Sequence, residues 1–232
     1  SIILRYPKLA SKPIEVIENI SEIDRFQSGY NEKKSYLAEK IGFQPRFTVL
    51  YAGTFGHVNG ISYVIDFASK LIHVDPTIIF ILIGRGAEKE IIIQKANEKG
   101  VLNKNVYILD SISKLDLPQL YFECDMGSSF VIPVEELWAN SANKFFDTLA
   151  SGKPIMINYK GWQKEVIDKE NIGYVMPVIL DDDQIKYFSI YSQNKLLIAK
   201  QQENALNIAK ERFATNIALK KYNKLFEEIF NY

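Results

Sequence analysis

The sequence predicts an α/β protein: a doubly wound, parallel, Rossmann-like sheet of about six strands, with helices on both faces and further helices at its C-terminal end. Two observations predict this fold. Short runs of apolar, mostly β-branched residues recur from Phe47 onward, and segments with helical periodicity separate them. Because the runs show no alternation with polar residues, they are typical of strands covered on both faces, as in parallel sheets.

The expected strands and helices alternate along the chain. Two strands stop at a glycine, Phe47–Ala52 at Gly53 and Thr77–Ile83 at Gly84. The other strands are expected at Asn105–Leu109, Asp125–Val131, Lys153–Ile157 and Gly173–Met176. Helices are expected over residues 60–74, 87–99, 116–123 and 141–151, each after one of the first four strands.

The segments on either side of this pattern differ from it. Residues 1–45 are interpreted as an entry segment with a short strand at Pro13–Ile17 and a polar helix at Asn31–Ile41. Residues 46–180 form the expected Rossmann-like domain. Residues 181–232 lack any strand pattern and predict two or three terminal helices. The chain starts at Ser1, already in an extended apolar pattern, which suggests a piece cut from a longer protein.

The composition excludes several classes of protein. The 28 Lys and Arg residues balance the 28 Asp and Glu residues, so nothing indicates nucleic-acid binding, which normally requires a basic excess. The single cysteine, Cys124, cannot form an internal disulfide and fits a reducing cytoplasm. His57 and His73 are not at metal-ligand spacing, so no metal site is expected. No apolar run reaches the roughly 18 residues of a membrane span.

The most informative segment is the helix expected after the fourth strand. Its apolar residues recur at helical spacing, as in a helix packed on a core: Ala142, Phe145, Phe146, Leu149 and Ala150. The opposite face carries Asn140, Asn143, Lys144, Asp147 and Ser151. This pattern fits two interpretations, a core helix with a solvated polar face or a helix whose polar face binds a ligand.

Two charged residues favour the second interpretation. Lys144 lies in the first turn, where the positive end of the helix dipole disfavours a cation unless an anion lies between them. Asp147 lies one turn further along, where a carboxylate would accept hydrogen bonds from a pair of vicinal hydroxyls. A phosphate and a pair of vicinal hydroxyls occur together in a nucleotide, so this face is interpreted as a nucleotide site.

Glycine loops follow the first two strands. The loop from Gly53 to Gly60 matches neither the G-x-G-x-x-G dinucleotide fingerprint nor a phosphate-binding P-loop, which disfavours an NAD-dependent dehydrogenase. The loop Gly84–Gly86 places Arg85 at a strand end. Arg85 is interpreted as either a diphosphate ligand or a solvent-facing loop residue.

Several passages, taken in order, resemble the C-terminal, donor-binding half of group 1 retaining glycosyltransferases, which have two facing Rossmann-like domains (the GT-B architecture). The resemblance extends over nearly the whole chain, and no single motif is decisive. The passages are Pro13–Phe26, Leu50–Gly56, Phe80–Gly86, Leu117–Asp125, Asn143–Pro154, Glu165–Ile167 with Gly173–Tyr174, and Glu211–Phe213. The helix passage is most similar to bacterial enzymes that build surface polysaccharides.

The resemblance implies a role for each matching residue. Asp147 would bind the ribose hydroxyls of a UDP- or GDP-linked sugar donor. Lys144 and Arg85 would stabilise the departing diphosphate, so they are the expected catalytic cations. The other expected donor contacts are Gly53, Thr54, Phe55, Gly56, Ser111, Ile112, Asn140, Ser141 and Asn143. No metal and no cofactor other than the donor is implied.

The chain departs from the family pattern at three positions. The first of two motif glutamates is replaced by Ala139, and the usual arginine and lysine after the first strand are replaced by Thr54 and Asn59. Much of the cationic clamp on the diphosphate is therefore missing, and Lys144 and Arg85 are the residues that would substitute for it.

The resulting hypothesis is the donor-binding domain of a hexosyltransferase-type enzyme in polysaccharide, lipopolysaccharide or capsule biosynthesis. A missing N-terminal domain of the same protein would hold the acceptor, so the chain alone would not be competent. The full-length protein is expected in the cytoplasm, with peripheral membrane association as an option. Two alternatives stay open: one half of a sugar-nucleotide 2-epimerase, and a non-catalytic nucleotide-binding relative.

Overall fold

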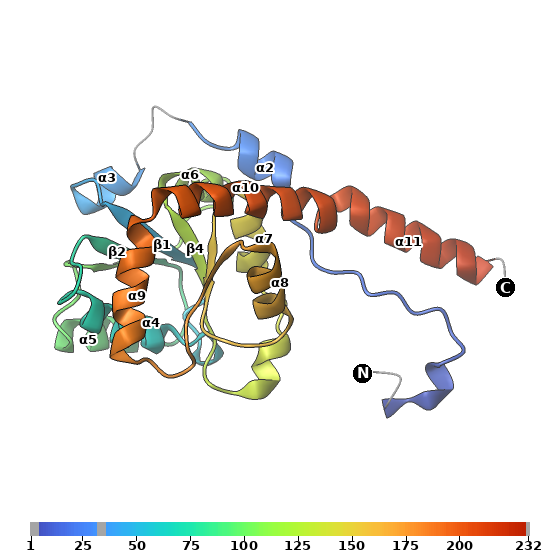
Figure 1. Cartoon of the computed structure of the whole chain (residues 1–232), viewed down its shortest axis with the longest axis horizontal. Coiled ribbons are helices and arrows are strands. Elements are labelled where there is room, and N and C mark those ends of the chain that lie inside the picture. Colours follow the sequence, from blue (N-terminus) through green and yellow to red (C-terminus); the bar gives the residue numbers. More distant parts are fainter. Residues whose placement is uncertain (1–4, 32–35, 231–232) are drawn as a thin grey trace.

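The computed structural model describes residues 5–31 and 36–230. Six parallel strands form one sheet with the order β3-β2-β1-β4-β5-β6, which confirms the predicted fold class (Figure 1). The strands are β1 (Phe47–Ala52), β2 (Ile78–Ile83), β3 (Val106–Leu109), β4 (Met126–Ser129), β5 (Ile155–Ile157) and β6 (Gly173–Val175). β1 pairs with β2 over its whole length, from Phe47 opposite Ile78 to Ala52 opposite Ile83.

Helices cover both faces of the sheet. One face carries α4 (Ile61–Leu71), α5 (Lys89–Glu98) and α9 (Asp182–Gln193), which bury apolar side chains against Val49 and Tyr51 of β1. The alternate strand residues, such as Leu50 and Ile81, face α2 (Ile23–Ser28), α3 (Tyr36–Ile41) and α6 (Leu117–Glu123). Around β5, α7 (Asn143–Ala150), α8 (Trp162–Glu170) and α10 (Lys195–Arg212) enclose a further apolar cluster. Continuous burial of β1 and β2 on both faces explains their unbroken apolar runs.

The chain reverses its winding direction between β1 and β4. From β1 it proceeds outward to β2 and β3, and from β4 it proceeds in the opposite direction to β5 and β6. In doubly wound folds this reversal opens a crevice at the carboxyl ends of the two central strands. Gly53 follows β1, and α7 follows β4, so both segments that the sequence predicts to bind a ligand lie at this crevice.

The N-terminal linker and the C-terminal helices contact each other on one side of the domain. Helix α11 (Thr215–Phe230) extends away from the sheet, with the N-terminal segment near it (Figure 1). The Glu18 carboxylate joins them, because it accepts hydrogen bonds from both Arg212 and Lys221. None of the described helices is both long and apolar enough to cross a membrane.

The entry segment differs from its predicted secondary structure. The strand expected at Pro13–Ile17 is wrong, because these residues pair with no strand of the sheet and Val16 is 71% exposed. Only the end of the helix expected at Asn31–Ile41 is seen, as α3, since residues 32–35 lie outside the described residues. The terminal helices number three, α9, α10 and α11, as the sequence predicted.

The close approach of the first two strand ends yields a stability prediction. A Cβ on Gly84 would lie 1.8 Å from the Gly53 carbonyl oxygen, so Gly84→Ala must push the two loops apart. We expect a loss of about 1–3 kcal/mol in the free energy of unfolding, measured by chemical denaturation. Gly56→Ala is the matched control, because its Cβ would meet nothing closer than 3.4 Å. Equal stability of the two variants would contradict the packing described.

Candidate functional site

The glycine loops after β1 and β2 are locked together by backbone contacts. The Gly53 N–H donates to the Ile83 carbonyl at 2.9 Å, and the Phe55 N–H donates to the Arg85 carbonyl at 2.9 Å. A Cβ on Gly86 would lie 2.2 Å from the Phe55 carbonyl oxygen, so only glycine permits this approach. Phe55 is fully buried, its N–H is taken up by the Arg85 carbonyl, and its carbonyl accepts from the Glu88 N–H at 3.0 Å, so the predicted donor contact at Phe55 has no exposed group.

Five of the predicted site residues line one pocket at the carboxyl edge of the sheet. Its volume is about 220 Å³, and its walls come from the ends of β1, β2 and β3 and the start of α6. The lining residues are Ala52, Gly53, Thr54, Ile83, Gly84, Arg85, Ser111, Ile112 and Leu117. The Arg85 side chain is exposed at its rim.

A larger groove, of about 520 Å³, lies along the polar face of α7. Asn143 and Asp147 line it, together with the linker residues before α2, Lys114 from the loop after β3, and Tyr222 of α11. Seven of the twelve predicted site residues thus line two neighbouring cavities. Lys144 lies between them, because it belongs to α7 and also touches Gly53.

The Lys144 side chain is packed against the end of β1. Its Nζ lies 5.0 Å from the centre of the Tyr51 ring, a cation–π contact. The Tyr51 hydroxyl donates to the Thr54 carbonyl at 2.7 Å, so the same ring also fixes the glycine loop. A Cβ on Gly53 would lie 3.2 Å from Lys144 Nζ, which shows how closely the ammonium approaches this loop.

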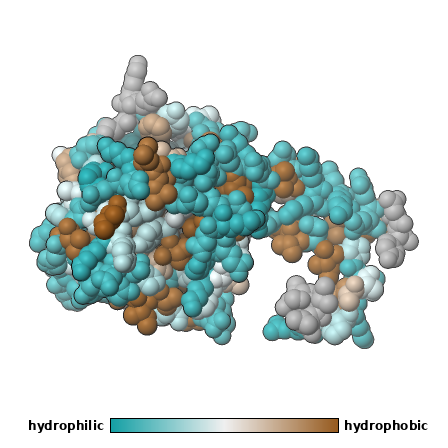
Figure 2. Space-filling model, in the orientation of Figure 1, coloured by the Kyte–Doolittle hydropathy of each residue, from teal (hydrophilic) through white to brown (hydrophobic). Residues whose placement is uncertain are grey.

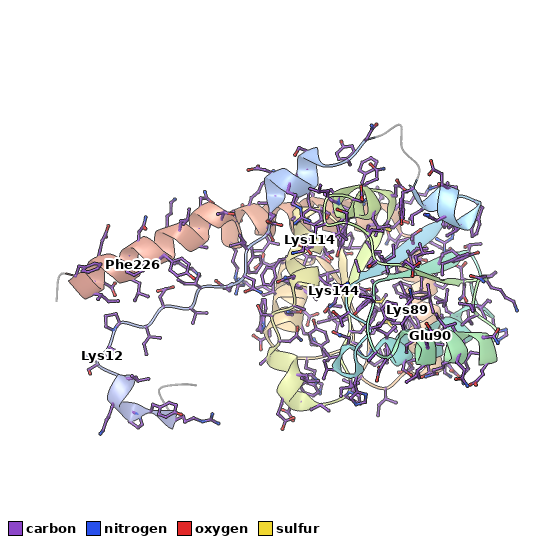
Figure 3. All side chains as sticks on the ribbon, turned by 180° about the vertical axis from the view of Figure 1, so that it is seen from behind. Lys12, Lys89, Glu90, Lys114, Lys144 and Phe226 are labelled. Carbon is purple, nitrogen blue, oxygen red and sulfur yellow. The ribbon has the colours of Figure 1, made fainter. Side chains whose placement is uncertain are left out.

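The charges of Lys144 and Asp147 are both disfavoured by burial. Burial lowers the pKa of the Lys144 ammonium, and the nearby Asp147 carboxylate opposes that effect. Burial raises the pKa of Asp147 to about 6, although Arg25, Lys114 and Lys144 act against the shift. Lys114 and Lys144 both act electrostatically on the Asp147 carboxylate, and Figure 3 shows these two lysines in the same part of the domain. A bound anion and a pair of hydroxyls would satisfy these two side chains.

The start of α7 is open to a ligand. The helix begins after Ala142, whose side chain cannot cap the first N–H groups. The Asn143 side chain is exposed, and its Oδ1 accepts from the Asn19 amide at 3.4 Å. Uncapped N–H groups next to a lysine fit the predicted phosphate position.

The structure gives Asn140 and Ser141 different surroundings from those expected of donor ligands. The Asn140 side chain closes a turn, donating to the Leu137 carbonyl at 2.9 Å and accepting from the Ala142 N–H at 3.3 Å. The Ser141 side chain is exposed, and its carbonyl accepts from the Asn19 amide at 2.8 Å. Their assignment as donor-binding residues stays a prediction.

Sequence reasoning missed four residues of the site. Tyr51 positions Lys144, Lys114 lines the groove, Asn19 holds the loop before α7, and Arg25 donates to the Lys114 carbonyl at 2.6 Å. Asn19 and Arg25 fall within the Pro13–Phe26 passage, and Lys114 follows Ser111 by three residues. None of the described His, Cys, Asp and Glu residues gather into a group that could hold a metal ion.

Fold and site together define a Rossmann-like α/β domain with a nucleotide-sized crevice at the reversal point of its sheet. The chain belongs to the group 1 glycosyl transferase family, whose model matches residues 36–212. A comparison with curated proteins finds no significant match.

Solved structures show the same fold. A glycosyltransferase from Rickettsia africae ESF-5 is 21% identical with a TM-score of 0.78, and the match covers 98% of this chain and 60% of that one. Anabaena HepE, solved with UDP-glucose, is 19% identical with a TM-score of 0.74, covering 94% and 57%. TarM from S. aureus, solved with UDP, is 18% identical with a TM-score of 0.71, covering 95% and 41%. The chain therefore spans about 40–60% of the length of these proteins.

The raised pKa of Asp147 predicts a stability effect of Asp147→Asn. The folded state holds the proton up to a pH of about 6, whereas an unfolded Asp loses it near 3.8. Asp147 therefore reduces stability progressively as pH rises from about 4 to 6, and the full penalty applies above that range. At pH 7.5 we expect Asp147→Asn to be more stable than the wild type by about 1–3 kcal/mol.

The measurement is chemical denaturation of both proteins from pH 4 to 8. The two proteins should converge toward pH 4, which serves as the internal control. A constant difference across this range would show that Asp147 titrates normally.

Proposed function

We propose that this chain is the donor domain of a retaining glycosyltransferase, which binds a nucleotide-diphosphate sugar in the crevice between the β1 loop and α7. The observation that carries the proposal is the pairing of Lys144 with Asp147. Lys144 lies beside Gly53 at the helix start, Asp147 lies one turn further along, and burial disfavours the charge of each. HepE and TarM, solved with UDP-glucose and UDP, support a uridine diphosphate donor.

Each part of the donor has a place in the proposed complex. The base would enter the pocket lined by Ser111, Ile112 and Arg85, and the ribose hydroxyls would donate to Asp147. The diphosphate would lie against the open start of α7 and the Lys144 ammonium. Positive charge at this point stabilises the leaving diphosphate as the glycosidic bond breaks, and the crevice orients the donor.

The chain would need a second domain for transfer. It corresponds to about half of the related structures, and the apolar face of α11 is exposed, with Phe226 at 53% and Phe230 at 83%. We propose that this face packs on a preceding domain that holds the acceptor. WaaG, another structural match at 15% identity, acts in lipopolysaccharide biosynthesis, which supports a role in surface-polysaccharide assembly.

The alternatives are separated by specific observations. Membership of the glycosyl transferase family argues against a dehydrogenase. A 2-epimerase half would bind the same donor, so only product analysis with the complete protein distinguishes it. A non-catalytic nucleotide-binding relative would bind the nucleotide without transferring a sugar, and Ala139, Thr54 and Asn59 are the residues that favour it.

The donor site predicts a discrimination between UDP and 2′-deoxy-UDP, measured by calorimetric titration. The wild type should bind UDP about 10-fold more tightly, because only UDP offers both hydroxyls to the Asp147 carboxylate. Asp147→Asn should weaken UDP and abolish the difference. Lys144→Met should weaken UDP but leave the preference for the ribose intact. GDP and ADP are titrated in parallel to identify the base, and binding of none of the three diphosphates would refute the donor site.

A second prediction concerns turnover. Incubated with UDP-glucose and a hydroxyl acceptor, the chain alone should release UDP no faster than its Lys144→Met variant, because the acceptor domain is absent. Coupled detection of UDP provides the measurement. Turnover that Lys144→Met abolishes would show that this chain contains a complete active site.

A further inference from the structure

Helix α9 has an exposed apolar stripe on the face of the domain opposite α7. Its inner side is buried, with Ile185 and Phe188 in the core against α4. On its outer side Tyr187 is 58% exposed and Ile190 is 65% exposed. Figure 2 shows apolar side chains at the surface over α9 and over the start of α10, surrounded by hydrophilic surface.

Charged and apolar residues extend this stripe in both directions. Asp183, Tyr187, Ile190 and Asn194 follow one another at intervals of four, three and four residues, so they share one face of the helix. Two nearly fully exposed apolar residues flank the helix, Ile179 before it at 82% and Leu196 after it at 87%. Acidic residues lie at its start, and Lys195 follows its end.

We propose that this stripe is the interface of a symmetric dimer, in which α9 packs antiparallel against α9 of a second copy. The midpoint between Tyr187 and Ile190 is also the midpoint between Asp183 and Asn194. A two-fold axis at that midpoint therefore brings Tyr187 against Ile190 of the partner subunit, and the reverse contact follows by symmetry.

The charges at the two ends of the stripe are complementary under this axis. Asp183 would face the end of the partner helix, next to Lys195 of the partner subunit, and the two helix dipoles would run antiparallel. Asp183 has only a long contact with Lys186, 3.8 Å between Nζ and Oδ1, and both side chains are highly exposed. Lys195 forms no ion pair with any of the described residues. Both charges are thus available to a second copy.

The proposed dimer is compatible with the crevice. The α9 stripe lies on the α4 face of the sheet, whereas α7 and its groove lie on the other face. The apolar centre is small, so we expect association in the micromolar range rather than an obligate dimer. The interface is independent of the proposed donor function, and its test requires no nucleotide.

Sedimentation equilibrium of the full chain tests the proposal. The mean mass should rise with concentration from 26.6 kDa toward twice that value. Ile190→Arg should hold the chain at the monomer mass, because each subunit would place a buried charge at the interface centre. Ile91→Arg on α5 is the matched control, since Ile91 is also an exposed helical isoleucine, at 62%, and this variant should dimerise normally.

A charge exchange tests the antiparallel register. Asp183→Lys alone and Lys195→Asp alone should each weaken dimerisation, because like charges would then face each other. An equimolar mixture of the two variants should recover it, since both ion pairs are restored in the mixed dimer. A monomer at every concentration, association that Ile190→Arg leaves unchanged, or no recovery in the mixture would each overturn the proposal.

Discussion

The reversal of winding direction between β1 and β4 is the constraint on which the site depends. It opens a crevice at the carboxyl ends of two adjacent strands. Gly53 borders the crevice from β1, and the start of α7 borders it after β4. Because residue 53 has no side chain, Lys144 of α7 can lie against the end of β1 and rest on the Tyr51 ring. This contact reinforces the direct pairing of β1 with β4 and places a cation in the crevice.

The charged residues of the linker and those of the crevice differ in how far neighbouring groups compensate the cost of their burial. Glu18, which joins the linker to α10 and α11, accepts from two cations, and these hydrogen bonds lower its pKa. At the crevice the pKa of Asp147 is raised and the pKa of Lys144 is lowered, because burial there is poorly compensated. Such residues reduce the stability of the empty fold. Their retention is physically reasonable if a ligand that carries both an anion and hydroxyls restores the lost interactions.

The sequence alone predicts the strands and helix faces that depend on local patterns of apolar residues. Apolar runs that end at a glycine located β1 and β2, and the stripe from Phe145 to Ala150 identified the buried face of α7. The site residues that sequence reasoning missed are held by contacts between residues far apart in the chain. The Asn19 amide donates to the Ser141 carbonyl, 122 positions away in the sequence. No periodic pattern of residues predicts such a contact. The extended segment at Pro13–Ile17 resembles a strand locally, but a strand needs a neighbour, and this one has none.

The linker before α2 contacts both the crevice and helix α11. Asn19 donates to the loop before α7, Ser21 donates to the Phe146 carbonyl, and Glu18 holds α11. Asp147 and Tyr222 line the same groove as this linker. A preceding domain that moved residues 17–22 would therefore also move the contacts beside the proposed ribose and phosphate positions. The α9 stripe lies on the opposite face of the sheet, so self-association there would leave that movement unobstructed.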